Sequence, residues 1–537
     1  MPTGSRDQER ALPIAWWLVA AGLFGLVIAI RIRLLEVPLE RDEGEYAYAG
    51  QLILQGIPPY TLAYSMKFPG IYGAYAAIMS VFGQTTLGIH LGLLLVNAAT
   101  IILIFLLGRK LANSVMGLTA GMSFAVLSVS PSVLGFAGHA THFVLLPVLG
   151  GTLLLLKAAD RRVFGSLLGS GVLFGLGILM KQPAVFFVLF GAVYLVSNNL
   201  RRRLRLEKIF LQTSIFSAGV ILPLSITWLL LWRIGVFDRF WFWTIDYARQ
   251  YGSLVPFSQA PRLLFYIARE VIVSGWPIWA LAGIGLVAGL WQPQTRRIAV
   301  FLFAFLFFSV LALCPGFYFR LHYFILVLPA VSLLAGVAIS RLSDLIADRL
   351  IAIRFIPILI LGFALAWPIL IDREFFFEAS PAHASRMIYP DSPFPESQRI
   401  AEFLREHATR NDTIAVLGSE PQIYFYSDRH SATGYIYMYG LMEPQKYASH
   451  MQQEMIRDIE RARPKFLISV VMPDSWLQRP ESERLIFNWA NEYAAQNYTV
   501  VGFVNMVAPD KTDYYFDNVP QSVPQLGKYI LIYQRKS

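Results

Sequence analysis

The sequence predicts an α-helical protein that crosses a membrane about eleven times and carries a water-soluble α/β domain towards its C-terminal end. Composition is the first reason. Of the 537 residues 56% are hydrophobic and 15% are charged, whereas soluble proteins usually carry about 25% charged residues. The second reason is distribution, because apolar runs of transmembrane length recur as far as Ile371 and then stop.

The expected spans share a run of mostly apolar residues bounded by polar or basic ones. They lie near residues 13–32, 85–107, 114–135, 143–157, 164–180, 183–198, 209–232, 271–291, 298–314, 321–340 and 351–371. The first apolar stretch, Leu12 to Ile30, is interpreted as a retained span. It is too long for the core of a signal peptide, and no small-x-small cleavage site follows it.

Clusters of basic residues orient these spans, because cytoplasmic loops are enriched in Lys and Arg. The clusters are Arg109-Lys110, Lys157 with Arg161-Arg162, Arg201 to Arg205, Arg296-Arg297, and Arg341, Arg349 and Arg354. We expect them, and the N-terminus with Arg6 and Arg10, on the cytoplasmic side of a bacterial-type inner membrane, with the C-terminal domain outside. The net charge of +10 then reflects topology and not nucleic-acid binding, since no basic stripe accompanies it.

Three segments follow from this organisation. Residues 1–371 form the membrane domain, with a first outward loop at 36–84. Residues 372–395 form a linker, and residues 396–537 form an extracytoplasmic α/β domain. In that domain helices over 397–407 and 481–496 alternate with strands over 413–417, 465–471, 498–504 and 528–533, which predicts a largely parallel sheet.

The first outward loop carries the residues with most chemical potential. Asp42, Glu43 and Glu45 lie within four positions on a stretch with helical spacing, expected to be a helix along the membrane surface. A carboxylate at a membrane edge can act as a general base, but acids near a helix N-terminus also stabilise the helix itself. Farther along, Lys67 precedes a proline turn. It could hold a phosphate or simply snorkel to the interface.

Several motifs, taken in order, resemble the GT-C class of integral-membrane glycosyltransferases, and most closely the protein O-mannosyltransferases and the aminoarabinose transferases of lipid A. The resemblance covers roughly residues 13–371. It rests on Asp42-Glu43, Gln55-Gly56-Ile57-Pro58, Lys67-Phe68-Pro69, Phe82-Gly83, Gly175 to Pro183, and Arg320-Leu321-His322-Tyr323 followed by Leu328-Pro329-Ala330.

The resemblance implies an enzyme that takes a sugar from a polyprenyl-phosphate carrier at the outer leaflet and transfers it, with inversion, to a hydroxyl of a lipid, glycan or protein acceptor. It implies Asp42 as the base, with Glu43 or Glu45 as its neighbour or substitute. The substrate-binding residues that it implies are Glu45, Tyr64, Lys67, Lys181, Arg320, His322 and Tyr323, with the cations around the donor phosphate.

No cofactor is expected. The sequence has no Walker-type glycine loop, and the relatives often carry an acid where this chain has Met66, which argues against a metal near that position. His139 and His142 could bind a metal, but a four-coordinate site needs further ligands that the sequence does not provide nearby. Hydrogen bonding is the favoured interpretation of these two histidines.

Two other function classes stay open. A transporter or flippase of lipid-linked saccharides would place charges near the bilayer midplane in repeated halves, whereas here ionisable residues lie at span ends. An oligosaccharide polymerase or ligase would use a pyrophosphate-linked polymer. Two further stretches allow two interpretations each: Phe240 to Trp243 as an interfacial belt or a ligand wall, and Gly418 to Pro421 as a turn or an acceptor-binding edge.

Overall fold

A computed structural model describes the chain except for residues 1–13, 162–163, 348, 509, 523–524 and 537. Arg6, Arg10 and Arg162, which helped to orient the spans, therefore lie outside the described residues. The chain divides into two units that are interleaved in sequence. The helical unit comprises Met1–Leu34, Leu91–Leu230 and Val255–Glu378, and the α/β unit comprises Leu35–His90, Leu231–Leu254 and Ala379–Ser537.

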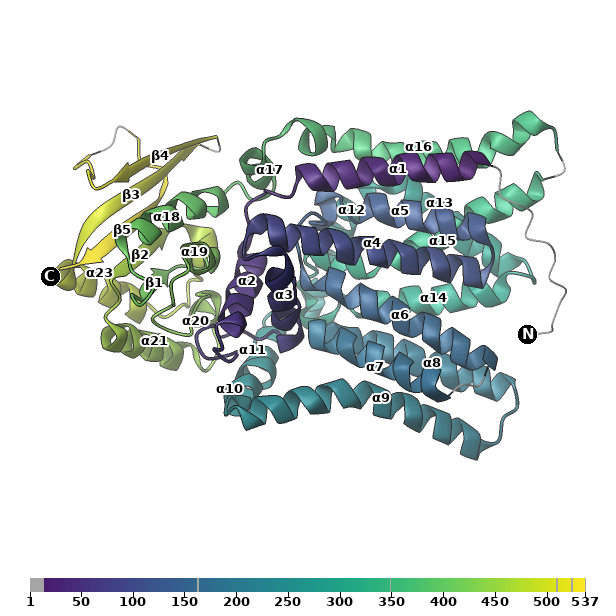
Figure 1. The fold of residues 1–537 in the computed structure, drawn as a ribbon, viewed down its shortest axis with the longest axis horizontal. Helices are drawn as coiled ribbons and strands as arrows, with labels where there is room; N and C mark the ends of the chain where they lie inside the picture. Colours follow the sequence, from purple (N-terminus) through teal and green to yellow (C-terminus); the bar gives the residue numbers. More distant parts are fainter. Residues whose placement is uncertain (1–13, 162–163, 348, 509, 523–524, 537) are drawn as a thin grey trace. The chain divides into compact units, whose positions relative to one another are not determined.

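Apolar helices of the expected spans make up the helical unit (Figure 1). In chain order they are α1 (Ile14–Arg33), α4 (Thr86–Leu111), α5 (Ser114–Leu127), η1 (Pro131–Val133), α6 (Ala140–Arg161), α7 (Phe164–Met180), η2 (Gln182–Ala184), α8 (Val185–Arg201), α9 (Leu206–Arg233), η4 (Phe257–Gln259), α12 (Ala260–Ser274), α13 (Trp276–Trp291), α14 (Arg296–Leu311), η5 (Pro315–Phe317), η6 (Leu321–Leu326), α15 (Leu328–Leu345), η7 (Ile351–Phe355), α16 (Ile356–Ile371) and η8 (Glu374–Glu378). Within this unit α6 packs along α7, and α15 packs along both α5 and α13.

Each expected span contains a helix, but the helices differ in length. Among the described residues, seven helices are long and apolar enough to cross a membrane, and a bent pair would make eight. Helices α5 and α7 are shorter than the roughly 20 residues that a full span needs. A multi-span helical protein is therefore confirmed, while the number of eleven spans stays a prediction.

The span expected over 271–291 is not one continuous helix. Its chain bends by 103° between α12 and α13. The break falls at Gly275, and Pro277 lies in the first turn of α13. Proline has no backbone N–H to donate, so it starts a new helix more readily than it continues an old one. The span expected over 321–340 is likewise divided into η6 and α15.

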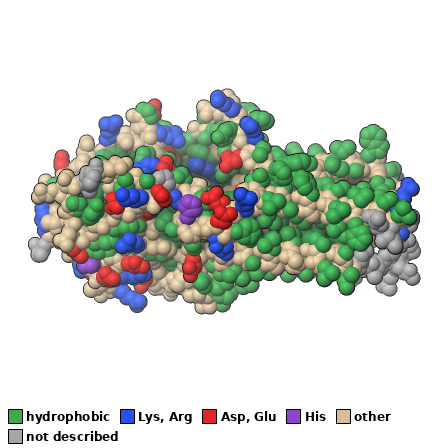
Figure 2. Space-filling model, turned by 90° about the horizontal axis from the view of Figure 1, so that it is seen from above, with side chains coloured by type: hydrophobic (Ala, Val, Ile, Leu, Met, Phe, Trp, Pro, Cys, Tyr) green, Lys and Arg blue, Asp and Glu red, His purple; other side chains and the backbone are tan. Residues whose placement is uncertain are grey.

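The surface of the helical unit fits a lipid environment. Figure 2 shows hydrophobic side chains covering the visible face of this unit, whereas Lys, Arg, Asp and Glu gather over the α/β unit. On α9, for example, Ile226, Leu229 and Leu230 are each more than half exposed. Soluble monomers rarely expose apolar patches of this extent, so contact with a membrane explains the surface.

A five-stranded sheet and short helices build the α/β unit (Figure 1). The helices are α2 (Arg41–Leu54), α3 (Pro69–Phe82), α10 (Phe237–Trp241), η3 (Phe242–Tyr247), α11 (Ala248–Gly252), α17 (Pro381–Ile388), α18 (Phe394–His407), α19 (Gln422–Ser427), α20 (Tyr439–Met442), α21 (Ala448–Ala462), α22 (Pro473–Trp476) and α23 (Leu485–Asn497). The strands are β1 (Ile414–Leu417), β2 (Phe466–Val471), β3 (Tyr498–Ala508), β4 (Lys511–Phe516) and β5 (Lys528–Arg535).

The expectation of a largely parallel sheet is wrong. The strand order is β1-β2-β5-β3-β4, and among the strand pairs of the described residues only β1 and β2 run parallel. Strand β4 was not expected, because its sequence KTDYYF is polar and lies at the sheet edge. Strand β4 pairs antiparallel with β3, which precedes it in the chain. Strand β5 then lies between β2 and β3 and is antiparallel to both.

One hydrophobic core joins all three segments of the α/β unit. Tyr64 from the first outward loop and Trp243 and Tyr247 from the second pack among Leu417 and Met455 of the C-terminal segment. The aromatic stretch that began as a candidate belt or ligand wall is thus largely core, because burying these rings removes a large apolar area from water. Both loops are structural parts of the C-terminal unit.

Helix α2 is deeply buried and is not a surface helix. All ten residues from Glu43 to Leu52 are buried. The ring of Tyr48 stacks on Tyr424 of α19, with 5.2 Å between centroids. A Cβ added to Gly44 would lie 2.7 Å from the backbone nitrogen of Gln422, so only glycine allows this approach.

We expect Gly44→Ala to destabilise the α/β unit by about 1–3 kcal/mol, because the added methyl meets backbone and not a movable side chain. Gly73→Ala is the matched control. Gly73 lies on α3 with nothing within 4 Å of an added Cβ, so alanine there should be neutral or slightly stabilising. Thermal unfolding in detergent, followed by intrinsic fluorescence, measures both, and equal melting temperatures would contradict the close packing.

A buried carboxyl lies beside the aromatic core. The Tyr247 hydroxyl donates to Oε2 of Glu443 at 2.8 Å, and Glu443 is 7% exposed. Burial raises the pKa of Glu443 from its usual 4.5 to about 7. Since the folded state favours the protonated carboxyl, the stability from this group is complete below about pH 4.5. It is lost as the pH rises through about 7.

Glu443→Gln should remove this pH dependence, because a glutamine keeps an acceptor for Tyr247 but never ionises. At pH 8 the variant should be more stable than the wild type by on the order of 1–3 kcal/mol, and at pH 4.5 the two should be similar. Melting temperatures at both pH values test this. A variant that is less stable at pH 8 would show that the charged form is the favoured one.

Candidate functional site

The N-terminus of α2 is closed by two of its acids. Glu40 caps the helix by accepting from the Glu43 backbone N–H at 2.9 Å, and the Glu43 carboxylate lies 3.5 Å from the Glu40 nitrogen. This reciprocal capping box satisfies donors that a helix start would otherwise leave unpaired. For Glu43 the helix-stabilising interpretation therefore has direct geometric support, and its catalytic role stays a prediction.

The other face of Glu43 meets a histidine. The Nδ1 atom of His90 lies 2.8 Å from the carbonyl oxygen of Leu35, and Nε2 lies 3.0 Å from Oε1 of Glu43. A carbonyl only accepts, so Nδ1 carries a hydrogen. The contact between Nε2 and the carboxylate then requires one further proton, held by either partner. This buried pair ties α2 to the start of α4.

Asp42 and Glu45 converge on one lysine. The Nζ atom of Lys67 lies 2.7 Å from Oδ1 of Asp42 and 2.7 Å from Oε2 of Glu45, and Tyr72 of α3 donates to Oε1 of Glu45 at 2.6 Å. The i, i+3 spacing places both acids on one face of α2. The Glu45 side chain is fully buried, whereas those of Asp42 and Lys67 are 24% and 23% exposed. Asp42 is thus the acid of the pair that water or a ligand can reach.

Electrostatics keep Lys67 charged. Burial alone would lower the pKa of Lys67, but the charges of Asp42 and Glu45 outweigh burial and raise the pKa above its usual value. The ammonium also lies 4.6 Å from the ring centroid of Tyr46 and 5.5 Å from that of Tyr437, a favourable environment for a cation. One ammonium therefore faces two carboxylates in this cluster.

Tyr437 of the C-terminal segment completes the surroundings of Asp42. Its hydroxyl lies 3.1 Å from Oδ1 of Asp42 and 3.0 Å from the carbonyl oxygen of Arg41. Tyr437 is not among the site residues that the sequence predicts. The alternation of tyrosines at 435, 437 and 439 was a visible signal, but nothing local linked it to residue 42.

Arg41 anchors the start of α2 on the turn after β1. Its guanidinium donates to the Ser419 carbonyl at 2.6 Å and to Oε1 of Glu420 at 3.2 Å. Ser475 donates to the other oxygen of Glu420 at 2.7 Å, and Glu420 is fully buried. Gly418 to Pro421 was open to two interpretations, and these contacts fit the structural turn. The turn holds Arg41, the residue that precedes Asp42.

Tyr64 lies in a different environment from Lys67. Its ring stacks on Trp243 with 5.2 Å between centroids and meets Tyr435 edge-on at 5.2 Å. Its backbone N–H donates to the carbonyl of Gly434 at 2.7 Å. These contacts make Tyr64 part of the core, and its expected place at the substrate stays a prediction.

The remaining expected residues gather at helix breaks of the helical unit. Lys181 separates α7 from η2 and lies over the ring of Tyr323, with Nζ 3.9 Å from its centroid. His322 of η6 meets Tyr323 edge-on at 4.8 Å and stacks on His139 at 4.0 Å with nearly parallel rings. The motif that contains Lys181 and the motif that contains His322 and Tyr323 therefore lie close together. The guanidinium of Arg320 lies over the ring of Tyr318, 5.5 Å from its centroid.

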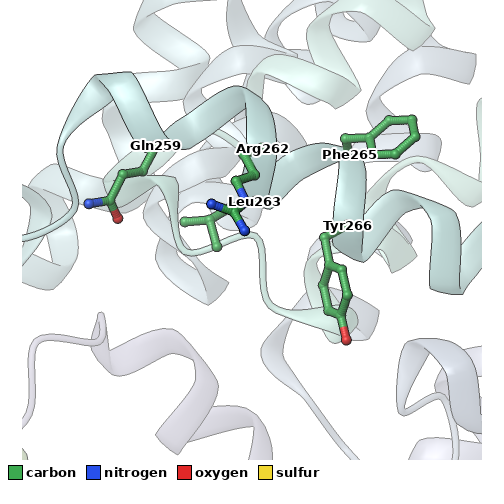
Figure 3. A pocket seen from close by; sticks show the side chains of 5 residues that line it. All are labelled: Gln259, Arg262, Leu263, Phe265 and Tyr266. Carbon is green, nitrogen blue, oxygen red and sulfur yellow. The ribbon is translucent and has the colours of Figure 1, made fainter.

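A separate hollow lies along η4 and α12 (Figure 3). Its lining residues are Gln259, Arg262, Leu263, Phe265 and Tyr266. Phe265 and Tyr266 are 73% and 67% exposed, so this is an open groove on one helix. It contains none of the residues expected in the site.

The fold of the chain is the GT-C fold of integral-membrane glycosyltransferases, as its motifs predicted. It is similar to ArnT from Cupriavidus metallidurans bound to undecaprenyl phosphate, with a TM-score of 0.57, 15% identity, and coverage of 95% of this chain and 99% of that one. For the apo state of the same ArnT the TM-score is 0.60 and the identity is 14%, with coverage of 97% of this chain and 98% of that one. The chain is also similar to the archaeal oligosaccharyltransferase AglB from Archaeoglobus fulgidus in complex with an inhibitory peptide and a dolichol-phosphate. The TM-score is 0.50 and the identity is 12%, with coverage of 95% of this chain and 75% of that one.

At the sequence level, the family model of dolichyl-phosphate-mannose-protein mannosyltransferases matches residues 69–228. No curated protein matches the chain. At identities of 12–15% the structural similarity concerns the fold, so the shared fold is what these structures establish. Activity has to be argued from the site itself.

Lys67→Met should destabilise the protein by about 3–5 kcal/mol, because it leaves Glu45 buried without its cation. The double variant Lys67→Met with Glu45→Gln should recover much of this loss, since it removes the buried charge as well. Lys465→Met is the matched control, because its pair with Asp412 is about one-third exposed and should contribute less than about 1 kcal/mol. Melting in detergent reports all three, and a double variant no better than Lys67→Met would contradict the argument.

Proposed function

We propose that this protein is a membrane glycosyltransferase that moves a sugar from a polyprenyl-phosphate carrier to an acceptor hydroxyl. The observation that carries the proposal is Asp42, a partly exposed carboxylate oriented by Lys67 and Tyr437 within an otherwise buried cluster. The fold supports it, because ArnT, which shares the fold, has been seen with undecaprenyl phosphate. The match to the mannosyltransferase family model over residues 69–228 points the same way.

Asp42 acts as the general base in this mechanism. It accepts the proton of the acceptor hydroxyl while the hydroxyl oxygen forms a bond to the anomeric carbon of the sugar. The bond between that carbon and the phosphate oxygen breaks, its electron pair stays on the phosphate, and the polyprenyl phosphate leaves. Attack opposite the leaving group inverts the anomeric centre. A positioned base of this kind contributes about 10²–10⁴-fold to rate.

Cations receive the charge that develops on the leaving phosphate. The sequence motifs predict Lys67, Lys181, Arg320 and His322 as these cations. Lys181 directly precedes η2 and α8, so the positive end of the helix dipole adds to its charge. We include no nucleotide and no divalent metal in the proposed reaction.

The orientation of the protein follows from the same proposal. The basic loops lie in the cytoplasm of a bacterial-type inner membrane and the α/β unit lies outside. The salt bridge between Arg41 and Glu420 joins the start of α2 to the C-terminal segment within one unit. It therefore supports the proposal that Asp42 and the C-terminal segment lie on the same side of the membrane. The site then opens towards the leaflet from which an extracytoplasmic acceptor is reached.

An oligosaccharide ligase is the second candidate. The similarity to AglB favours it over a transporter, since AglB is an oligosaccharyltransferase with a related fold. The two enzyme classes differ in donor. Membranes that contain the protein should transfer a labelled monosaccharide from its polyprenyl-phosphate ester if the first proposal holds, and only oligosaccharide from a pyrophosphate carrier if the second holds.

Asp42→Asn should reduce transfer by at least about 100-fold while the protein remains folded, because an amide cannot take the acceptor's proton. The assay supplies polyprenyl-phosphate mannose, followed by esters of other sugars, and measures label in lipid, glycan and protein fractions. Asp428→Asn is the matched control: Asp428 has a left-handed backbone with φ 52°, which asparagine adopts readily, and it pairs with Arg410. Full activity of Asp42→Asn together with loss in Glu43→Gln would assign the base to Glu43.

A further inference from the structure

The stretch Thr433 to Tyr439 carries tyrosines at alternate positions, and its central tyrosine reaches the cluster on α2. It belongs to the C-terminal segment, which begins more than 300 residues after Asp42. In its neighbourhood Tyr435 donates to Glu454 at 2.7 Å and Tyr439 donates to the carbonyl of Asp474 at 3.0 Å. The hydroxyl of Tyr437 is hydrogen-bonded to Asp42, the proposed catalytic residue.

The backbone on both sides of Tyr437 is held in place. Before it, the carbonyl of Gly434 accepts from the Tyr64 N–H, and a Cβ on Gly434 would lie 2.3 Å from the Tyr64 ring. After it, the N–H of Met438 donates to the Ser419 hydroxyl at 2.9 Å, and that hydroxyl donates to the Ser475 carbonyl at 2.5 Å. The Tyr437 ring therefore starts from a fixed backbone, which is what orienting a neighbour requires.

The hydroxyl of Tyr437 has one hydrogen and two acceptors within reach. Oδ1 of Asp42 lies at 3.1 Å and the carbonyl oxygen of Arg41 at 3.0 Å, and neither atom can donate while Asp42 is ionised. Burial, together with the charges of Asp42 and Glu45, raises the pKa of Tyr437 well above its usual value. The hydroxyl thus remains a donor, and its bond to a carboxylate is of the stronger, charge-assisted kind.

We propose that Tyr437 is a positioning residue for the base: its hydroxyl orients the Asp42 carboxylate through Oδ1 and stabilises its ionised form, so that the C-terminal segment supplies part of the catalytic arrangement. This inference rests on the proposed function. Both Tyr437 and Lys67 contact the same oxygen of Asp42, which fixes the plane of the carboxylate. Tyr437 keeps its proton throughout, so the proton of the acceptor hydroxyl still goes to Asp42 and the bonds made and broken in the transfer step stay the same.

The second acceptor gives the arrangement its use during a reaction cycle. When Asp42 takes the acceptor's proton its negative charge disappears, and its demand for a donor weakens. The Tyr437 hydrogen can then turn to the Arg41 carbonyl without becoming unsatisfied. Arg41 itself is held by Ser419 and Glu420, so this second acceptor does not move.

Removal of the hydroxyl should shift the titration of Asp42 in a defined direction. Within the α/β unit the groups that interact with this region include Lys67, Glu45, Glu40, Tyr46, Tyr75, Tyr389 and the neighbouring Arg41, and they stay in place when only the Tyr437 oxygen is deleted. A lost donor disfavours the carboxylate relative to the acid, so the acid limb of the pH profile should move to higher pH. This limb in kcat/KM reports the essential base of the free enzyme.

Tyr437→Phe is the test, with Tyr435→Phe as its matched control. Both remove one hydroxyl from the same stretch, but the Tyr435 hydroxyl contacts Glu454 and not the cluster on α2. For Tyr437→Phe we expect kcat to fall roughly 10- to 100-fold, KM for the donor to change less than about threefold, and the acid limb to rise by about one pH unit. Tyr435→Phe should keep the wild-type pH profile.

The assay uses full-length protein in membranes with the polyprenyl-phosphate sugar that the wild type turns over, and melting temperatures confirm that both variants fold. A Tyr437→Phe profile that matches Tyr435→Phe, while Asp42→Asn is inactive, overturns the positioning role and leaves the base intact. Full activity of Asp42→Asn overturns the proposed base itself, whatever the tyrosine variants do. A fall in kcat with an unshifted acid limb would show a purely structural role for Tyr437 and also overturns the inference.

Discussion

The helix after the first span takes carboxylates out of water, and much of the α/β unit is arranged to compensate for this. Glu45 is fully buried, and Glu43 is 1% exposed. A buried charge is costly unless a counter-charge and hydrogen bonds meet it. Lys67 and Tyr72 meet Glu45, and His90 meets Glu43. Asp42 differs because it keeps both a cation and access to the surroundings, which is the combination that a general base needs.

The need for these partners explains why the unit is assembled from distant parts of the chain. The first outward loop supplies Lys67 and Tyr72, the second supplies Trp243 for the core, and the C-terminal segment supplies Glu420 and Tyr437. The C-terminal segment thus functions as a structural support for the loops between spans, and separate folding of the loops is not expected.

Fold and site contribute different parts of the functional argument. The fold is shared with ArnT and AglB at identities of 12–15%, and a shared fold does not by itself specify a donor or an acceptor. The acid–lysine cluster is more specific, because it combines a reachable carboxylate with a lysine whose charge the neighbouring acids maintain. Proton acceptance is the chemistry that we propose for Asp42 in this pair.

The sequence by itself determined the helices and their membrane character, and it singled out Asp42 and Lys67 as candidates whose roles stay predictions. Apolar runs, basic clusters and motif order are local features, and the helices α7 and α9 lie almost where those features predict. Local patterns also predicted β1, β2 and β5, but they failed for strand direction and for the polar edge strand β4, because pairing depends on neighbours far away in sequence.

Only the tertiary structure decided how the acids divide their roles and which residues support them. Asp42 and Tyr437 are 395 positions apart, and Arg41 and Glu420 are 379 apart. No local sequence pattern can reveal contacts between residues so far apart. These contacts arise from the packing of α2 against α19 at Gly44 and from the need to pair buried charges. On the residues alone the sequence did not separate Glu43 from Asp42, and the resemblance to GT-C glycosyltransferases was what favoured Asp42 as the base. The rotation of α2 within its packed surroundings directs one towards the capping box and His90, and the other towards Lys67 and Tyr437.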